Sequence, residues 1–264
     1  MLPQVTFLGH ASVLIEVAGV RILTDPVLFS RVAFLGRVSA EIHATAYADV
    51  DVVLISHLHH DHCDIKSLKI LDEATVVVPE GAGEYLFRKG VTNLVELPVG
   101  QSFRANPTSD KPVIITATFA DHDGARSPVG PNAVAIGFTI STEESTVYFA
   151  GDTDMFPEMA ALPGVGKSGV DIALLPVWGW GPNLGPGHMN PSRAADALEL
   201  IKPTFAIPIH WGTLFPYGLR RVRPQLSELL VSPPREFAAI ATERGIGEQV
   251  VVVEPGSIAR LGDE

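Results

Sequence analysis

The chain of 264 residues has a single cysteine, Cys63, and no long uninterrupted apolar run. One cysteine excludes an intramolecular disulfide. A helix that spans a bilayer needs about 20 consecutive apolar residues, and no segment supplies them. The N-terminal stretch has no basic segment ahead of its apolar residues, and Glu16 interrupts these, so we expect no signal peptide. The expected location is the cytoplasm, with no stable membrane insertion.

Positive charge is also scarce. The chain has 19 Lys and Arg residues but 30 Asp and Glu residues, which gives a net charge of −11. Binding to nucleic acid needs clustered Lys and Arg, so a nucleic acid is not the expected partner. The one basic run, Arg220-Arg221-Val222-Arg223, is interpreted as a solvated surface segment. A content of 46% hydrophobic and 19% charged residues argues against disorder. No Ser/Gly-rich linker divides the chain, so we expect a single domain over residues 1–264.

Histidine, in contrast, is concentrated in the stretch His57-Leu58-His59-His60-Asp61-His62. This stretch follows the apolar run Asp51–Ser56, which is typical of a buried strand. A single histidine at a strand end is usually a hydrogen-bonded surface residue. Four histidines and one aspartate in six positions are different, because burying so many polar groups costs free energy unless hydrogen bonds or a metal ion satisfy them. Imidazole and carboxylate suit zinc and other divalent metals, so the stretch predicts a metal site, and the neighbouring Cys63 is expected to pack behind it.

Three further apolar segments end in a residue that can bind a metal. They run over residues 114–120, 147–150 and 205–209 and lead to His122, Asp152 and His210. Taken singly, these could be a loop histidine, an ordinary Gly-Asp turn and a buried core histidine. Strand ends at one edge of a sheet converge, and α/β sites are commonly built there. We therefore expect these three side chains to meet the six-residue stretch.

The expected secondary structure mixes strands and helices in both halves of the chain. Helices are expected from an N-cap at Asp64 to residue 71, over residues 81–89, and over residues 191–201 with Asn190 as cap. Residues 224–244 predict one more helix that Pro233-Pro234 interrupts, and residues 29–47 predict an irregular loop. Strands are expected at residues 5–8, 13–17, 20–23, 51–56, 75–78, 94–97, 113–119, 133–140, 146–150, 170–176, 204–209 and 249–253. This pattern favours an α/β fold of two sheets packed face to face with helices outside.

The residues His57, His59, Asp61 and His62 fit the pattern His-x-His-x-Asp-His, and through them the sequence resembles the metallo-β-lactamase-fold hydrolase superfamily. More narrowly, it resembles the branch that contains ascorbate-6-phosphate lactonase and N-acylphosphatidylethanolamine-hydrolysing phospholipase D. Residues 6–16, 23–26, 187–191 and 209–213 carry that narrower similarity. The resemblance implies a four-layer αββα sandwich of the α/β class, with the site along one edge.

The resemblance also implies a ligand set for two divalent metal ions, with Zn²⁺ expected and Mn²⁺ or Fe²⁺ as alternatives. It assigns His57, His59 and His122 to the first ion. It assigns Asp61, His62 and His210 to the second ion. It makes Asp152 the ligand that bridges both ions.

The function expected from this set is that of a metal-dependent hydrolase. A hydroxide that bridges the metals would cleave an ester, lactone or phosphodiester bond of a small, phosphorylated substrate. The alternatives are a non-catalytic metal-binding or ligand-sensing module on the same fold, and a lipid phosphodiesterase. Sensors built on enzyme folds often lose ligands, whereas this ligand set is complete.

Several other residues have expected roles at such a site. Asp61 would also help to neutralise the metals and orient the nucleophile. His188 would contact the oxyanion or protonate the leaving group, with a structural role at the start of a helix as the alternative. Trp178 and Trp180 would line the substrate pocket, or pack in the core. His10 and Asp25 would orient the metal ligands from outside.

Overall fold

The structure is a computed structural model that describes residues 2–106, 109–126, 130–166 and 169–262. Its larger sheet is antiparallel on one side and parallel on the other, because β1 to β3 form a meander and β3, β6, β7 and β8 run parallel. In spatial order its seven strands are β16 (Ser257–Ile258), β1 (Gln4–Gly9), β2 (Ser12–Val17), β3 (Val20–Thr24), β6 (Val52–Leu54), β7 (Thr75–Pro79) and β8 (Leu94–Leu97).

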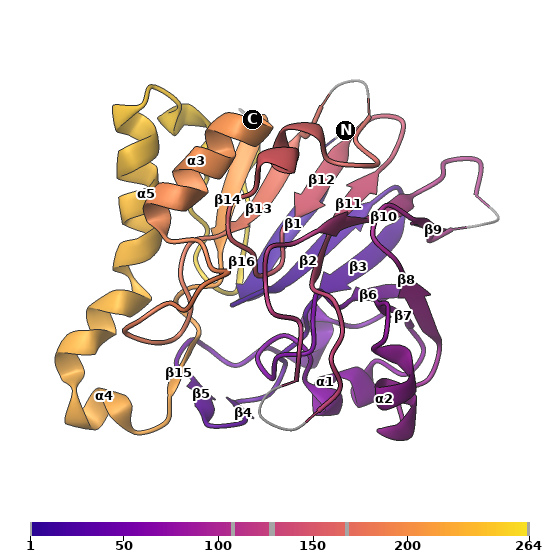
Figure 1. The fold of residues 1–264 in the computed structure, drawn as a ribbon, viewed down its shortest axis with the longest axis horizontal. Helices are drawn as coiled ribbons and strands as arrows, with labels where there is room; N and C mark the ends of the chain where they lie inside the picture. The colour runs from indigo at the N-terminus through magenta and orange to yellow at the C-terminus, as the bar shows by residue number, and fades with distance from the viewer. Residues whose placement is uncertain (1, 107–108, 127–129, 167–168, 263–264) are drawn as a thin grey trace.

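The second sheet has the same mixed character, with β12, β13 and β14 parallel and the others antiparallel. Its six strands are β14 (Phe205–Ile209), β13 (Ile172–Pro176), β12 (Thr146–Phe149), β11 (Ile136–Ser141), β10 (Ile114–Phe119) and β9 (Ser102–Arg104). Helices cover the outer faces of both sheets (Figure 1). Those beside the second sheet are α3 (Pro191–Ile201) and α5 (Ser232–Glu243), and those beside the first are α1 (Ile65–Ile70) and α2 (Gly83–Arg88). The predicted α/β sandwich is confirmed.

The strand β6, which leads into the histidine-rich stretch, is buried on both faces. Val52 and Leu54 belong to the main core, which includes the space between the sheets, while Val53 and Ile55 belong to the core under α1 and α2. A strand buried on both faces needs apolar side chains at every position, which explains the continuous apolar run in the sequence. The histidine-rich stretch is therefore anchored by a strand in the middle of the molecule.

Two of the expected helix starts are confirmed. The Asp64 side chain accepts hydrogen bonds from the backbone N–H groups of Lys66 and Ser67 at the start of α1. The Asn190 side chain accepts one from Arg193 N at 3.0 Å, and Pro191 occupies the first turn of α3. Both side chains satisfy backbone donors that a helix leaves unpaired at its N-terminus.

The expected irregular loop over residues 29–47 is a wrong prediction. It contains β4 (Arg31–Val32) and β5 (Leu35–Arg37), which join β15 (Leu214–Pro216) in a small third sheet, and the 3₁₀ helix η1 (Ala44–Ala46). These strands have only two or three residues, and their pairing with β15 joins segments far apart in the sequence. Such short, non-local pairing leaves almost no periodic pattern in the sequence.

Two expectations near the C-terminus are also wrong. The prolines Pro233 and Pro234 do not interrupt a helix but lie in the first turn of α5, where a missing N–H costs nothing. The short helix α4 (Leu219–Val222) and the 3₁₀ helix η3 (Pro224–Leu230) precede it. Residues 249–253 form no strand of the sheet and make only a single bridge, between Val250 and Ala206. Within the described ranges, no helix combines the length and apolarity that crossing a membrane requires.

We predict that Asn190→Ala lowers the free energy of unfolding by about 1 kcal/mol, because α3 loses its N-cap hydrogen bond. Urea denaturation of the metal-loaded protein measures this change. Asn190→Asp keeps an acceptor at the same position and should leave the stability close to that of the parent protein. Equal stability of the two variants would contradict the capping role.

Candidate metal centre

All predicted metal ligands lie in loops that follow the C-terminal ends of strands. The stretch His57–His62 follows β6, and His122 follows β10. Asp152 follows β12, and His210 follows β14 directly. These strands lie in two different sheets, and their ends meet at one edge of the sandwich, as the sequence predicted.

The structure brings the two predicted ligand groups together as separate clusters. The possible ligand atoms of His57, His59 and His122 lie within 4.8 Å of one another. Those of Asp61, His62 and His210 do so as well, and His10 belongs to the same cluster. The assignment of these side chains as ligands remains a prediction, and its geometric requirement is met.

Asp152 lies between the two clusters. One of its carboxylate oxygens is 3.2 Å from His62 Nε2, and the other is 3.2 Å from His210 Nε2. Asp152 also forms a third group with His122 and His188, whose possible ligand atoms lie within 4.8 Å of one another. This carboxylate thus contacts His62 and His210 of the second cluster and lies within 4.8 Å of a possible ligand atom of His122 in the first, as a bridging ligand requires.

Hydrogen bonds on the outer side of the histidine rings determine which nitrogen faces the centre. His62 Nδ1 is 2.7 Å from Asp25 Oδ2, and His122 and His210 donate from Nδ1 to backbone carbonyls at 2.7 and 2.6 Å. A neutral imidazole that donates from Nδ1 has a free lone pair on Nε2. The Nε2 atoms of His62 and His210 are only 3.0 Å apart, so their lone pairs converge on the same space.

The two residues expected to orient the ligands make the contacts that this role needs. Asp25 accepts hydrogen bonds from Ser56 N at 2.7 Å and Ser56 Oγ at 2.5 Å, in addition to its contact with His62. His10 Nε2 is 3.0 Å from Asp61 Oδ2, and its ring centroid is 3.9 Å from that of His210. Outer hydrogen bonds of this kind fix ring orientation and ligand basicity in metal sites.

The remaining predicted residues lie around the clusters. His188 Nε2 is 3.6 Å from Asp152 Oδ2, while its Nδ1 faces the carbonyls of Gly185 and Pro186. Trp178 contributes its carbonyl oxygen to His210, and its indole N–H donates to Gly181 O. The ring of Trp180 packs on a small apolar cluster and meets Phe34 edge-on at 5.0 Å. Their role in a substrate pocket remains a prediction.

The charge states of the clusters suit a cation. Burial lowers the pKa values of His57 and His210 well below the ordinary value, and it lowers that of His59 to about 4. Burial opposes ionisation of Asp61 and Asp152, yet the histidines around them hold both pKa values well below the usual range. Neutral imidazoles and ionised carboxylates are the forms that bind metal ions.

His62 behaves differently from the other rings. Burial alone would lower its pKa, but Asp152 and Asp25 on either side raise it well above the ordinary value. The proton on His62 is therefore one that metal binding must displace, so metal uptake should release protons.

The backbone at the site adopts conformations that are uncommon for residues other than glycine. His10, Asp25 and His210 have φ angles of 57°, 33° and 65°. Gly151, directly before Asp152, has φ 64°, and a Cβ on it would lie 2.6 Å from the Ser56 Cβ. Such conformations cluster at functional sites and persist only where the surrounding structure enforces them.

The sequence reasoning missed Arg126, which supports the histidine-rich stretch from behind. Its guanidinium donates to Leu58 O, Cys63 O and His60 Nδ1, each at 2.9 Å. His60 thereby faces Arg126 and belongs to none of the clusters. Cys63 packs in the apolar core, where burial raises its pKa to about 12, so it acts as a packing residue. No local pattern marks Arg126, because it contacts the stretch from more than sixty residues away.

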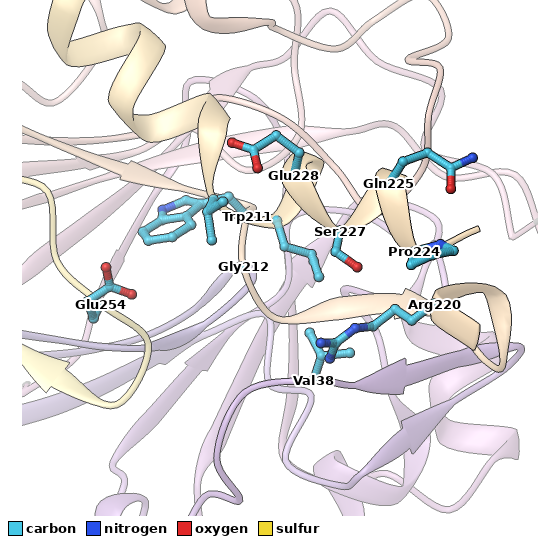
Figure 2. A pocket seen from close by; sticks show the side chains of 11 residues that line it. Val38, Trp211, Gly212, Arg220, Pro224, Gln225, Ser227, Glu228 and Glu254 are labelled. Carbon is cyan, nitrogen blue, oxygen red and sulfur yellow. The ribbon is translucent and has the colours of Figure 1, made fainter. Parts of the chain in front are cut away.

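One cavity near His210 does not include the ligand clusters. It has a volume of about 530 Å³, and Trp211 and Gly212, which follow His210 in the chain, line it (Figure 2). Arg220, Glu228 and Glu254 also line this cavity. The groups with converging lone pairs and charge lie in the clusters and not in this cavity.

The donor set fits metal ions. His57 Nε2 is buried and has no hydrogen-bond partner among the described residues. Asp152 Oδ1 is also buried without a hydrogen bond there, because His210, whose Nε2 lies 3.2 Å away, donates its proton from Nδ1 to Trp178 O. Buried polar atoms without partners are costly, so a ligand at this point is expected to satisfy them. Imidazole nitrogens and carboxylate oxygens are the donors that zinc, manganese and iron accept.

Comparison with known families agrees with this site. Residues 20–211 match the family described as the Beta-lactamase superfamily domain. The match covers more than half of the chain, which therefore belongs to this family and has the metallo-β-lactamase fold. Within the family, the chain is a metal-dependent hydrolase.

Three relatives illustrate the relationship. A UPF0173 metal-dependent hydrolase of Methanopyrus kandleri is 30% identical over 257 residues, which cover 96% of this chain and 97% of the relative. An N-acyl-phosphatidylethanolamine-hydrolyzing phospholipase D of Caenorhabditis elegans is 28% identical over 247 residues, covering 85% of this chain and 69% of the relative. The solved structure of Igni18, a metallo hydrolase of Ignicoccus hospitalis, has a TM-score of 0.73 over 99% of both chains at 24% identity, a likeness that supports the fold alone.

We predict that Asp25→Asn weakens metal binding by roughly 10–100-fold. The amide can donate to His62 Nδ1, which would shift the ring proton to Nε2 and remove the lone pair that faces the centre. Asn also tolerates the positive φ at this position. Competition with a chromophoric chelator measures the affinity.

Asp123→Asn is the matched control, because it makes the same change from carboxylate to amide in an exposed side chain that belongs to none of the clusters. Its metal affinity should change much less. If Asp25→Asn bound metal as tightly as the parent protein, the orienting role of Asp25 would be wrong.

Proposed function

We propose that this protein uses two divalent metal ions to hydrolyse an ester, lactone or phosphodiester bond of a small, phosphorylated molecule. The observation that carries the proposal is the position of Asp152 beside members of both ligand clusters. In this proposal His57, His59 and His122 hold one ion, and Asp61, His62 and His210 hold the other. Zn²⁺ fits this donor set, with Mn²⁺ and Fe²⁺ as alternatives.

A pair of divalent ions supplies Lewis-acid polarisation of the scissile group and activation of water at neutral pH. The side chains of the protein supply charge balance and orientation. The carboxylates of Asp61 and Asp152 would offset the positive charge of the ions, while Asp25 and the Trp178 carbonyl fix the rings of His62 and His210. Preorganised groups of this kind stabilise charge that develops in the transition state.

His188 is the proposed proton donor to the leaving group. Its Nε2 faces Asp152, and its side chain is 23% exposed, so it can reach both the clusters and a substrate that enters from solvent. Its Nδ1 donates to backbone carbonyls, which orients the ring, so the proton for the leaving group would come from Nε2 of the imidazolium form and leave a neutral imidazole with its proton on Nδ1. A positioned histidine is the commonest general acid in enzymes.

The substrate class follows from the relatives and from the charge of the chain. The phospholipase D of C. elegans hydrolyses a phosphodiester, which favours including phosphodiesters, lipid ones among them, beside lactones and esters. The net charge of −11 disfavours nucleic acid, so the proposed partner is a small molecule. A non-catalytic sensor on the same fold is the alternative, and turnover distinguishes it from an enzyme.

We predict that Asp152→Asn lowers turnover by roughly a hundredfold or more, because the site loses a charge beside both clusters. The measurement is hydrolysis of a panel of lactones, esters and phosphodiesters, with Zn²⁺, Mn²⁺ or Fe²⁺ restored to the stripped protein. Metal content per chain by mass spectrometry should fall from two ions toward one. Thermal unfolding by circular dichroism verifies that the variant folds.

Asp123→Asn serves as the control, since Asp123 is an exposed carboxylate in the loop of His122 and belongs to none of the clusters. It should keep turnover and metal content. Stable binding of panel compounds without turnover in the parent protein would reject the enzyme and support the sensor.

We predict that His188→Gln lowers kcat by roughly a hundredfold for substrates with poor leaving groups, in the range typical of a lost general acid. For activated substrates such as nitrophenyl esters the loss should be small, because their leaving groups need no protonation. Metal content should not change. An equal loss for both kinds of substrate would show that His188 only positions the substrate.

A further inference from the structure

A second cavity, of about 340 Å³, lies beside the small third sheet and contains none of the predicted metal ligands. The hairpin β4–β5 and the strand β15 form its walls, joined by hydrogen bonds such as Tyr217 N to Phe34 O at 3.0 Å. Among the residues that line it, Arg31, Arg37 and Arg220 are cationic, and no residue is acidic. In a chain of net charge −11, three arginines without an acid in one cavity are unusual.

These arginines are not neutralised by neighbouring carboxylates. Within the described part of the chain, no Asp or Glu oxygen lies within 4.0 Å of their nitrogens, whereas Arg88, Arg193 and Arg244 each have such a partner. The Arg31 guanidinium instead lies 3.9 Å from the centre of the Tyr217 ring, which restrains it at the rim of the cavity. Charge of one sign, held in a hollow, attracts a counter-ion of the opposite sign.

Arg37 is the most constrained of the three. Its Nη1 donates to Leu8 O at 3.4 Å and to Ser39 Oγ at 3.2 Å, its Nη2 donates to Val27 O, and its Nε is buried without a hydrogen-bond partner among the described residues. Burial lowers the pKa of Arg37 to about 10, which reflects the cost of a guanidinium that no anion compensates. Arg220 completes the group, and its exposed side chain extends from α4 toward Val38 (Figure 2).

We propose that this cavity binds a phosphate group, either as the free ion or as part of a phosphate monoester. Guanidinium groups match the geometry of phosphate oxygens and bind them by paired hydrogen bonds. The exposed guanidinium groups of Arg31 and Arg220, with the positive charge of Arg37 behind them, suit a dianion better than a carboxylate, which carries a single charge. The Ser30 residue at the rim offers a hydroxyl as a further donor.

The proposed site is separate from the metal centre but mechanically linked to it. Arg37 contacts the carbonyl of Leu8, two residues before His10. Val38 N donates to Thr213 O, and the Thr213 hydroxyl accepts from His10 N, each at 2.8 Å. A bound phosphate should therefore stabilise the turn that holds His10, whether or not the proposed hydrolysis is correct.

The test is titration of the metal-loaded protein with inorganic phosphate by calorimetry, at fixed ionic strength in chloride. The expected result is saturable binding that Arg31→Gln and Arg220→Gln each weaken by roughly tenfold or more, with metal content and turnover unchanged. Both residues are exposed, so neither variant should disturb folding. Arg221→Gln is the matched control, because this neighbour on α4 does not line the cavity, and its affinity should equal that of the parent protein.

Three results would overturn the proposal: no saturable binding, equal weakening by Arg221→Gln, or binding that chelation of the metal abolishes and Arg31→Gln leaves unchanged. The last would assign the phosphate to the metal centre. A parallel titration with glycerol phosphate distinguishes the two sources of the ligand. Tighter binding than that of inorganic phosphate identifies a monoester, equal binding identifies the free ion, and both support the site.

Discussion

The architecture of this protein depends on one constraint, the burial of histidine nitrogens whose lone pairs converge at one edge of the sandwich. His57 Nε2 has no partner among the described residues, and the Nε2 atoms of His62 and His210 face each other at 3.0 Å. Burial of such groups costs free energy unless a cation compensates it. A scaffold that holds them together must therefore obtain its stability elsewhere, and the extensive apolar cores between and outside the sheets supply it.

The positions of the strands explain how so many polar groups can be held at one place. Each predicted ligand follows a strand whose side chains are mostly buried, as Val52 and Leu54 are in β6. The left-handed backbone at His10, Asp25 and His210 requires that the adjoining strands be rigid, since none of these residues is glycine. The hydrogen bond from His210 N to His10 O, at 2.8 Å, joins the ends of strands from the two sheets at the centre itself.

Much of the site could be predicted from the sequence because its signals are local. The stretch His57–His62 directly follows an apolar strand, and His210 ends another, so residue type and strand position together indicate the cluster. Arg126 could not be predicted this way, because its contacts with Leu58 and Cys63 exist only in the folded chain. The same holds for the carbonyl of Trp178, since nothing in the side-chain sequence shows which backbone oxygen will accept from His210.

The fold shows the same division between local and non-local information. Asp64 and Asn190 cap their helices as predicted, because capping depends on residues two or three positions away. The prolines Pro233 and Pro234 were misread because proline both ends helices and starts them, and only the tertiary position of α5 decides between the two.

The small third sheet was the least predictable part of the chain, yet it adjoins the metal centre. Its strand β15 comes soon after His210, and Thr213 between them accepts a hydrogen bond from His10 N at 2.8 Å. Gly9 fits against Thr213 only because it lacks a Cβ, which would lie 2.6 Å from the Thr213 hydroxyl. The packing of this sheet therefore sets the position of the β1–β2 turn. A change in the hairpin β4–β5 can shift His10, and through it the ligand Asp61, without replacing any ligand residue. Variation in this sheet can therefore adjust the site while the ligand set stays the same.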